Sequence, residues 1–178
     1  MNRSRKVVVL CHCLLNANVK VQPLATHAGA LAIVISEFAA KGVGLFQLPC
    51  PETSFLGLRR WGMTSEQYDH PAFRRHCREI LSSSLDQLEA LYRDDCQLVG
   101  VVGVDGSPSC GMFTTCTGYR GGEISAKSTD LRAQVESLYS SSHQGIFMQE
   151  FLGMLKDRGI SIPLWAVDED APDNLKTS

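Results

Sequence analysis

The chain has 178 residues, 44% of them hydrophobic, and its 17 Lys and Arg residues face 19 Asp and Glu residues for a formal net charge of -2. A chain of this length can bury roughly 70% of its unfolded surface, so a single domain over 1–178 is expected. The balanced charge gives no indication of a nucleic-acid partner, and no apolar run approaches the roughly 20 residues that span a bilayer, so a membrane role is not expected either.

Short β-branched runs alternate with longer helical patterns along the chain. This alternation predicts an α/β fold, a single Rossmann-like domain with a small, mainly parallel sheet flanked by helices. The first strand is the valine-rich run at 7–10. A helix over 28–40 follows and ends at a basic residue and a glycine, Lys41 and Gly42. The second strand, at 45–48, comes soon after this cap.

The second half of the chain continues the same alternation. Its predicted elements are, in order, a helix at 71–93, a strand at 98–104, a helix at 146–156 and a strand at 160–167. A loop-rich insert at about 112–129 is expected to pack over the site as a lid, and the tail from Ala171 is expected to be frayed. Five arginines form either a pocket for an anionic group or a solvated helix face: Arg59, Arg60, Arg74, Arg75 and Arg78.

Three cysteines each follow one of the predicted strands. Cys13 comes after the first strand, Cys50 after the second and Cys110 after the third. In an open parallel sheet the ligand crevice lies outside the carboxyl ends of the strands, where these three loops would meet. Thiolates are the usual ligands of zinc and of iron–sulfur clusters, so the pattern predicts a metal site. The alternative is three unrelated core cysteines, because free cysteine is among the most buried residue types.

The cysteine count and spacing narrow the kind of site. An odd number of cysteines, seven, without a secretory signal before the run at 7–10 predicts a cytoplasmic protein with reduced thiols. The wide separations do not match the local ligand pairs of structural zinc sites. A cluster held by three cysteines would leave one iron open to a substrate. Cys11 and Cys13 form the close pair in this region, which leaves a redox or sulfur-transfer pair as another hypothesis.

Three short motifs resemble those of a known family. Cys13-Leu14-Leu15-Asn16, Cys50-Pro51-Glu52 and Ser107-Pro108-Ser109-Cys110-Gly111 are similar, in this order, to the signature motifs of the DUF523 family, whose characterised members are thiouracil desulfurases. The similarity covers the chain from about 6 to 111. It implies a [4Fe–4S] cluster held by Cys13, Cys50 and Cys110, with the remaining iron binding the substrate sulfur. It also implies a catalytic carboxylate and serine, matched here by Glu52 and either Ser109 or Ser107.

The chain departs from the usual family pattern in three places. Cys11 and His12 stand where the family usually has serine and alanine, bulky and basic residues follow Glu52 where glycine is usual, and Asp105 precedes Ser107. These differences suggest a divergent branch whose substrate need not be thiouracil.

We therefore expect an iron–sulfur-dependent, desulfurase-like enzyme that takes sulfur from a thiolated small heterocycle. Glu52 would act as acid and base, and Ser109, or alternatively Ser107, would be the catalytic serine. Ser109 would hydrogen-bond the substrate's other carbonyl or orient the water. One alternative is a non-catalytic metal- or cluster-binding module. The other is a thiol-based sulfur-transfer or redox protein that uses Cys11 and Cys13. The sequence leaves the oligomeric state open.

Overall fold

The computed structural model describes residues 3–122, 131–172 and 174–177. Its main element is a five-stranded sheet in the order β2-β1-β3-β6-β7. The strands are β1 (Lys6–Leu10), β2 (Gly44–Gln47), β3 (Gln97–Val104), β6 (Leu164–Val167) and β7 (Lys176–Thr177). The first four run parallel, and β7 is antiparallel to β6. The fold is α/β and Rossmann-like, which confirms the fold class predicted from the alternating patterns.

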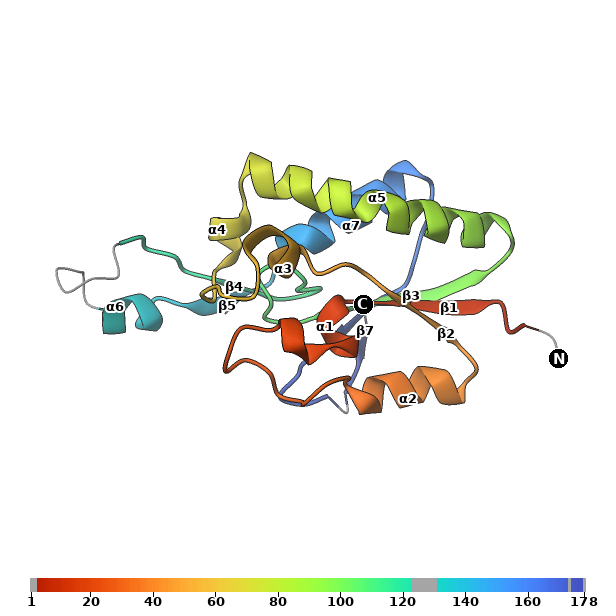
Figure 1. The fold of residues 1–178 in the computed structure, drawn as a ribbon, viewed down its shortest axis with the longest axis horizontal. Coiled ribbons are helices and arrows are strands. Elements are labelled where there is room, and N and C mark those ends of the chain that lie inside the picture. Colours follow the sequence, from red (N-terminus) through yellow and green to blue (C-terminus); the bar gives the residue numbers. More distant parts are fainter. Residues whose placement is uncertain (1–2, 123–130, 173, 178) are drawn as a thin grey trace.

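Helices cover both faces of this sheet (Figure 1). α5 (Pro71–Arg93) and α7 (Ile146–Asp157) lie together on one face, and α2 (Ala32–Ala40) lies on the opposite face with the short helix α1 (His12–Leu15). Strands covered on both faces need apolar side chains in both directions. This explains why β1 and β3 are runs of valine and leucine rather than alternating patterns.

The long helix α5 follows directly from its sequence. Its buried positions recur every three or four residues: Phe73, Cys77, Leu81, Leu85 and Leu88. At its start Pro71 occupies a position where a missing N–H costs nothing, and Nδ1 of His70 accepts the N–H of Phe73 at 3.3 Å. The predicted range 71–93 is therefore confirmed.

Three elements differ from the sequence predictions. α2 begins at Ala32 rather than at 28, because the N–H of Leu31 donates to the carbonyl of Leu14 and holds this segment against α1. β6 begins only at Leu164, after a proline that cannot donate to a sheet. The expectation of a frayed tail was wrong, since β7 pairs with β6 and Nζ of Lys176 lies 3.4 Å from Oδ2 of Asp105.

The predicted insert at 112–129 is described only up to 122, and the rest of it lies outside the described residues. Its described part contains β4 (Thr115–Thr117), which pairs antiparallel with β5 (Tyr139–Ser141). α6 (Leu131–Glu136) precedes β5, and Figure 1 shows these elements projecting from the sheet. The N–H of Gly118 donates to Glu66 at 2.7 Å, and this bond connects the two-stranded ribbon of β4 and β5 to α4 (Ser65–Tyr68).

No helix in the described part of the chain combines the length and apolar character needed to cross a membrane.

Candidate functional site

A cavity of about 480 Å³ lies at the carboxyl edge of the parallel strands. Its size is typical of small-molecule sites. All six predicted site residues line it: Cys13, Cys50, Glu52, Ser107, Ser109 and Cys110. Their loops converge because β1 has β2 on one side and β3 on the other, and all three strands run in one direction. The insert was expected to pack over the site, but none of its described residues, 112–122, lines this cavity.

The loop that carries Cys110 is fixed by the start of α7. The N–H groups of Ile146 and Met148 donate to the carbonyls of Pro108 and Ser109, both at 3.1 Å. These amides belong to the first turn of a helix, which leaves them without partners of its own. A Cβ on Gly145 would lie 2.4 Å from the carbonyl carbon of Ser109, so this close approach requires glycine.

Hydrogen bonds also set the positions of Ser107 and Cys50. Oγ of Ser107 accepts the N–H of Cys110 at 3.0 Å and so closes the loop as a serine turn. Cys50 is the N-terminal cap of α3 (Pro51–Leu56), and its sulfur accepts the N–H of Thr53 at 3.5 Å. Both residues therefore have a structural role besides facing the cavity.

The pKa of each of the three thiols is raised above its ordinary value. Burial raises the pKa of Cys13 to about 12, and the neighbouring Cys110 adds to this effect. Burial also raises the pKa of Cys50, partly offset by its hydrogen bond with Thr53. The pKa of Cys110 is raised by a hydrogen bond with Cys11 and then by burial. All three are protonated at neutral pH, so metal binding would release protons.

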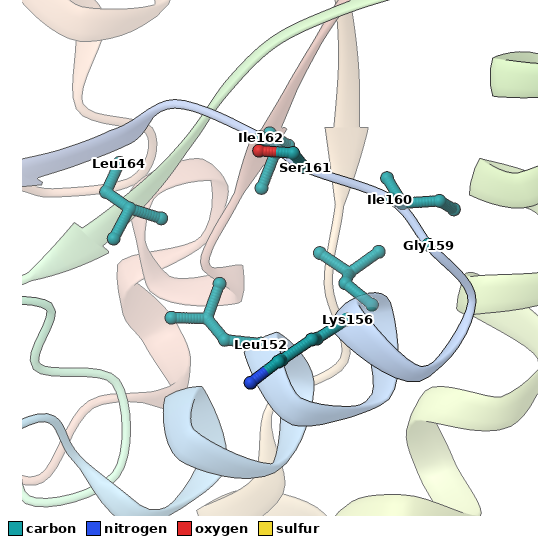
Figure 2. Close-up of a pocket in the computed structure, with 8 residues that line it drawn as sticks. Leu152, Lys156, Gly159, Ile160, Ser161, Ile162 and Leu164 are labelled. Atoms are coloured by element: carbon teal, nitrogen blue, oxygen red, sulfur yellow. The ribbon is translucent and has the colours of Figure 1, made fainter.

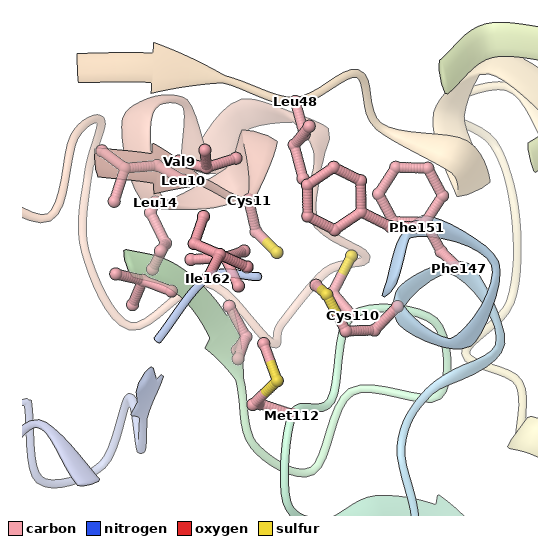
Figure 3. Close-up of a cluster of buried hydrophobic side chains, with 14 of the residues drawn as sticks. Val9, Leu10, Cys11, Leu14, Leu48, Cys110, Met112, Phe147, Phe151 and Ile162 are labelled. Atoms are coloured by element: carbon pink, nitrogen blue, oxygen red, sulfur yellow. The ribbon is translucent and has the colours of Figure 1, made fainter. Parts of the chain in front are cut away.

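Cys11 and Cys13 face different surroundings. Cys11 is 1% exposed and packs in the hydrophobic core, where Figure 3 shows it among apolar side chains near Cys110. Cys13 lines the cavity, and Cys11 does not. Both are free thiols, and this division does not favour a redox pair made of the two.

A buried polar network forms one wall of the cavity. Oγ of Ser109 donates to Oε1 of Glu52 at 2.6 Å, and the other oxygen, Oε2, accepts Nε and Nη2 of Arg60 at 3.2 and 3.1 Å. The side chains of Arg60 and Glu52 are only 5% and 15% exposed. The hydroxyl of Tyr68 is buried beside them, and burial followed by the charge of Glu52 raises its pKa. The carboxylate is thus held in one orientation by groups on both of its oxygens.

The basic residues separate into two groups. Arg60 reaches the cavity, whereas Arg74 and Arg78 pair with Glu150 of α7 at 2.7 and 2.6 Å. Only part of the predicted basic stretch therefore belongs to the site. Asp105 has a structural role, since its Oδ1 accepts two backbone N–H groups of the loop after Cys110.

Sequence reasoning missed a second polar pair in the cavity. Lys20 and Glu169 both line it and form an ion pair, with side chains 12% and 11% exposed. Burial lowers the pKa of Lys20, and the nearby Cys13 and Glu52 oppose this shift. These two residues are 149 positions apart, so no local pattern connects them.

The cavity has thiol donors from three loops. Among the described residues, no three His, Cys, Asp or Glu side chains are close enough together to hold one metal ion. Three cysteines nevertheless line this one cavity, and thiolates are the usual ligands of zinc and of iron–sulfur clusters.

A second depression lies elsewhere on the molecule (Figure 2). It has a volume of about 370 Å³ and is formed by α7 and the segment before β6, including Leu152, Lys156, Ile160 and Leu164. Because β6 is parallel to β3, this segment lies at the amino edge of the sheet, opposite the cysteine loops. Its lining carries no cysteine or carboxylate. The candidate site is therefore the cavity at the carboxyl edge.

Comparison with known proteins identifies a relative that is itself uncharacterized. No family model matches the chain, and no solved structure matches it significantly. The chain is 30% identical over 111 residues to a protein of Methanocaldococcus jannaschii described as uncharacterized protein MJ0003. The similar segment covers 62% of this chain and 70% of that protein. The chain therefore belongs to the same family as uncharacterized protein MJ0003 of Methanocaldococcus jannaschii.

Proposed function

We propose that the chain is an iron–sulfur-dependent, desulfurase-like enzyme that removes sulfur from a thiolated, thiouracil-like heterocycle in the cytoplasm. The observation that carries the proposal is the convergence of Cys13, Cys50 and Cys110 on one cavity whose wall also holds Glu52 and Ser109. The order of the DUF523-like motifs supports the same assignment. Reduced cysteines are typical of the cytoplasm, and the described cysteines are free.

The cofactor would be a [4Fe–4S] cluster bound by Cys13, Cys50 and Cys110. With three cysteine ligands, a bound cluster would supply one open iron as a Lewis acid toward the sulfur of the substrate. Lys20 lies within electrostatic reach of Cys13 and Cys110. Its ammonium therefore offsets part of the negative charge that thiolate ligands bring into the cavity.

The reaction replaces C=S by C=O without transfer of electrons. One water supplies the oxygen, the carbon–sulfur bond breaks, and sulfur leaves as hydrogen sulfide with both protons of the water. Glu52 can take a proton from the attacking water at Oε1, because Ser109 and Arg60 fix the carboxylate. Oε1 accepts one described hydrogen bond, from Ser109, and so retains a lone pair, whereas Oε2 already accepts two from Arg60. Arg60 positions Glu52 through two hydrogen bonds to Oε2.

Conversion of 2-thiouracil by anaerobically reconstituted protein tests the proposal. We expect uracil and hydrogen sulfide in equal amounts. Cys50→Ser should lose the activity, because a hydroxyl is a poor substitute for a soft thiolate ligand. Cys116→Ser is the matched control, since Cys116 is a half-buried cysteine of β4 that does not line the cavity. If iron-loaded protein releases no sulfide from 2-thiouracil or 4-thiouracil, a non-catalytic cluster-binding module replaces this proposal.

A further inference from the structure

Glu169 lines the cavity and carries a buried acceptor that no described group pairs with. It follows β6, and its Oε2 forms the ion pair with Nζ of Lys20. Its second oxygen, Oε1, is buried and accepts no hydrogen bond from any described residue. Nδ1 of His27 lies 3.9 Å from this oxygen, which is beyond hydrogen-bond distance.

An acceptor in this state is unfavourable in a folded protein. A buried carboxylate oxygen has lost its hydration, and without a donor it recovers none of that free energy. Nearly all buried polar atoms have partners, so an unpaired one calls for a specific explanation. Because Glu169 lines the cavity, a molecule that binds there and displaces the groups covering Oε1 can supply the missing donor.

The position of Glu169 connects it to the candidate catalytic groups. Its partner Lys20 lies within electrostatic reach of Cys13, Cys110 and Glu52. Nε2 of His27, the ring beside Glu169, lies 3.4 Å from the carbonyl of Cys13. Glu169 and the cysteines thus line the same cavity, and Lys20 and His27 connect them.

We propose that Oε1 of Glu169 orients the substrate by accepting an N–H of a cyclic amide or thioamide. The ammonium of Lys20 has two N–H donors beyond the one it gives to Glu169, and these can meet the adjacent carbonyl oxygen. An acceptor and a donor side by side match the N–H and C=O edge of a lactam ring. The identity of the heterocycle rests on the proposed function, whereas the edge recognition applies equally to the sulfur-free product.

The subsite makes a prediction about which ring substituents are tolerated. A methyl group on the ring nitrogen removes the donor and leaves Oε1 of Glu169 buried beside an apolar group. Sites built to pair a polar group discriminate strongly against analogues that lack it. N-methylated rings should therefore bind poorly even though they are more apolar.

Calorimetric titration with uracil and 1,3-dimethyluracil tests this inference on the anaerobically reconstituted protein. We expect uracil to bind roughly tenfold or more tightly than the dimethyl compound, the loss expected for one buried hydrogen bond. Glu169→Leu should weaken uracil binding to the level of 1,3-dimethyluracil. Glu37→Gln is the matched control, because it breaks an exposed Lys–Glu pair on α2, with Lys41, and should leave both affinities unchanged.

A second variant tests whether the loss of uracil binding in Glu169→Leu is caused by misfolding. Glu169→Leu leaves the ammonium of Lys20 buried without its partner, which can destabilise the fold. The double variant Lys20→Met/Glu169→Leu removes both charges and should also lose the preference for uracil. The inference would be overturned if the wild type bound uracil and 1,3-dimethyluracil equally well or did not bind uracil at all. It would also be overturned if a folded variant without Glu169 still preferred uracil. Uracil preference without turnover of 2-thiouracil contradicts only the proposed reaction, and turnover with equal affinities contradicts only the role of Glu169.

Discussion

At the scale of single residues, the hydrogen bonds around Glu52 are the main evidence for its proposed role in proton transfer. The Cys50-Pro51-Glu52 motif predicted its place near the cysteines, and the cavity contains it. The partners that fix it were less accessible to sequence reasoning. Ser109 is 57 positions away, and Arg60 was one of several arginines with two interpretations. The contact with Ser109 depends on how the loops after β2 and β3 meet, so no local pattern predicts it. Arg60 is only 8 positions from Glu52, but the sequence did not distinguish it from the other arginines.

Glu52→Gln distinguishes the catalytic role proposed for this carboxylate from a structural one. The amide keeps the shape of the side chain and cannot take a proton from water. Turnover of 2-thiouracil should fall by on the order of 10² to 10⁴, the range for general acid–base groups, while iron content and visible absorption stay unchanged. The measurement is kcat beside the absorption spectrum of the same sample.

Two other results for Glu52→Gln would change the assignment. Bleaching of the protein would make Glu52 a support of the metal site. Unchanged kcat would move the proton transfer to another group, and His12 is a candidate because it also lines the cavity. Asp105 is a weaker candidate, since its Oδ1 already holds the N–H groups of Phe113 and Thr114.

At the scale of elements, length decided how much the sequence could predict. The periodic pattern of α5 extends over 23 residues, and its range was predicted without error. Shorter elements such as the ribbon of β4 and β5 have three residues each and no pattern of their own. β7 has two residues and depends on pairing with β6 and on Lys176. Their partners are distant in the sequence, so local propensity could not reveal them.

The buried thiol of α5 gives the protein a pH dependence that can be measured. Burial raises the pKa of Cys77 from 9.0 to about 12. The native state then holds this proton more tightly than the unfolded chain does, so the stabilisation is complete below pH 9.0 and declines as the pH rises toward about 12. Urea unfolding of cluster-free protein should therefore show a free energy of unfolding that falls over this interval.

Cys77→Ala is the variant that isolates this effect. It should be less stable at neutral pH, because it leaves a small cavity where a fully buried side chain packed. Its free energy of unfolding should nevertheless decline less steeply above pH 9.0, because one titrating thiol is gone. Parallel declines in the wild type and the variant would show that Cys77 does not titrate as its burial implies.

At the scale of the whole molecule, strand order creates the site. β1 has β2 on one side and β3 on the other, so the loops after all three strands open onto the same edge. The sequence predicted which strands end in cysteines and that the sheet is parallel. It did not contain the ion pair of Lys20 and Glu169, which forms only when the segment after β6 closes over the loop after β1. The positions of the cysteines after the strands could therefore be predicted from the local sequence. The ion pair could not, because it depends on how distant segments meet in the fold.

The central claim is that Cys13, Cys50 and Cys110 together hold one cluster. Analysis of iron and acid-labile sulfide in anaerobically reconstituted protein tests it most directly. We predict about four iron atoms and about four sulfides per chain in the wild type and in Cys116→Ser. Each of the variants Cys13→Ser, Cys50→Ser and Cys110→Ser should lose most of both. Full iron content in any of these three variants, or wild-type protein that takes up zinc and no iron, would contradict the claim.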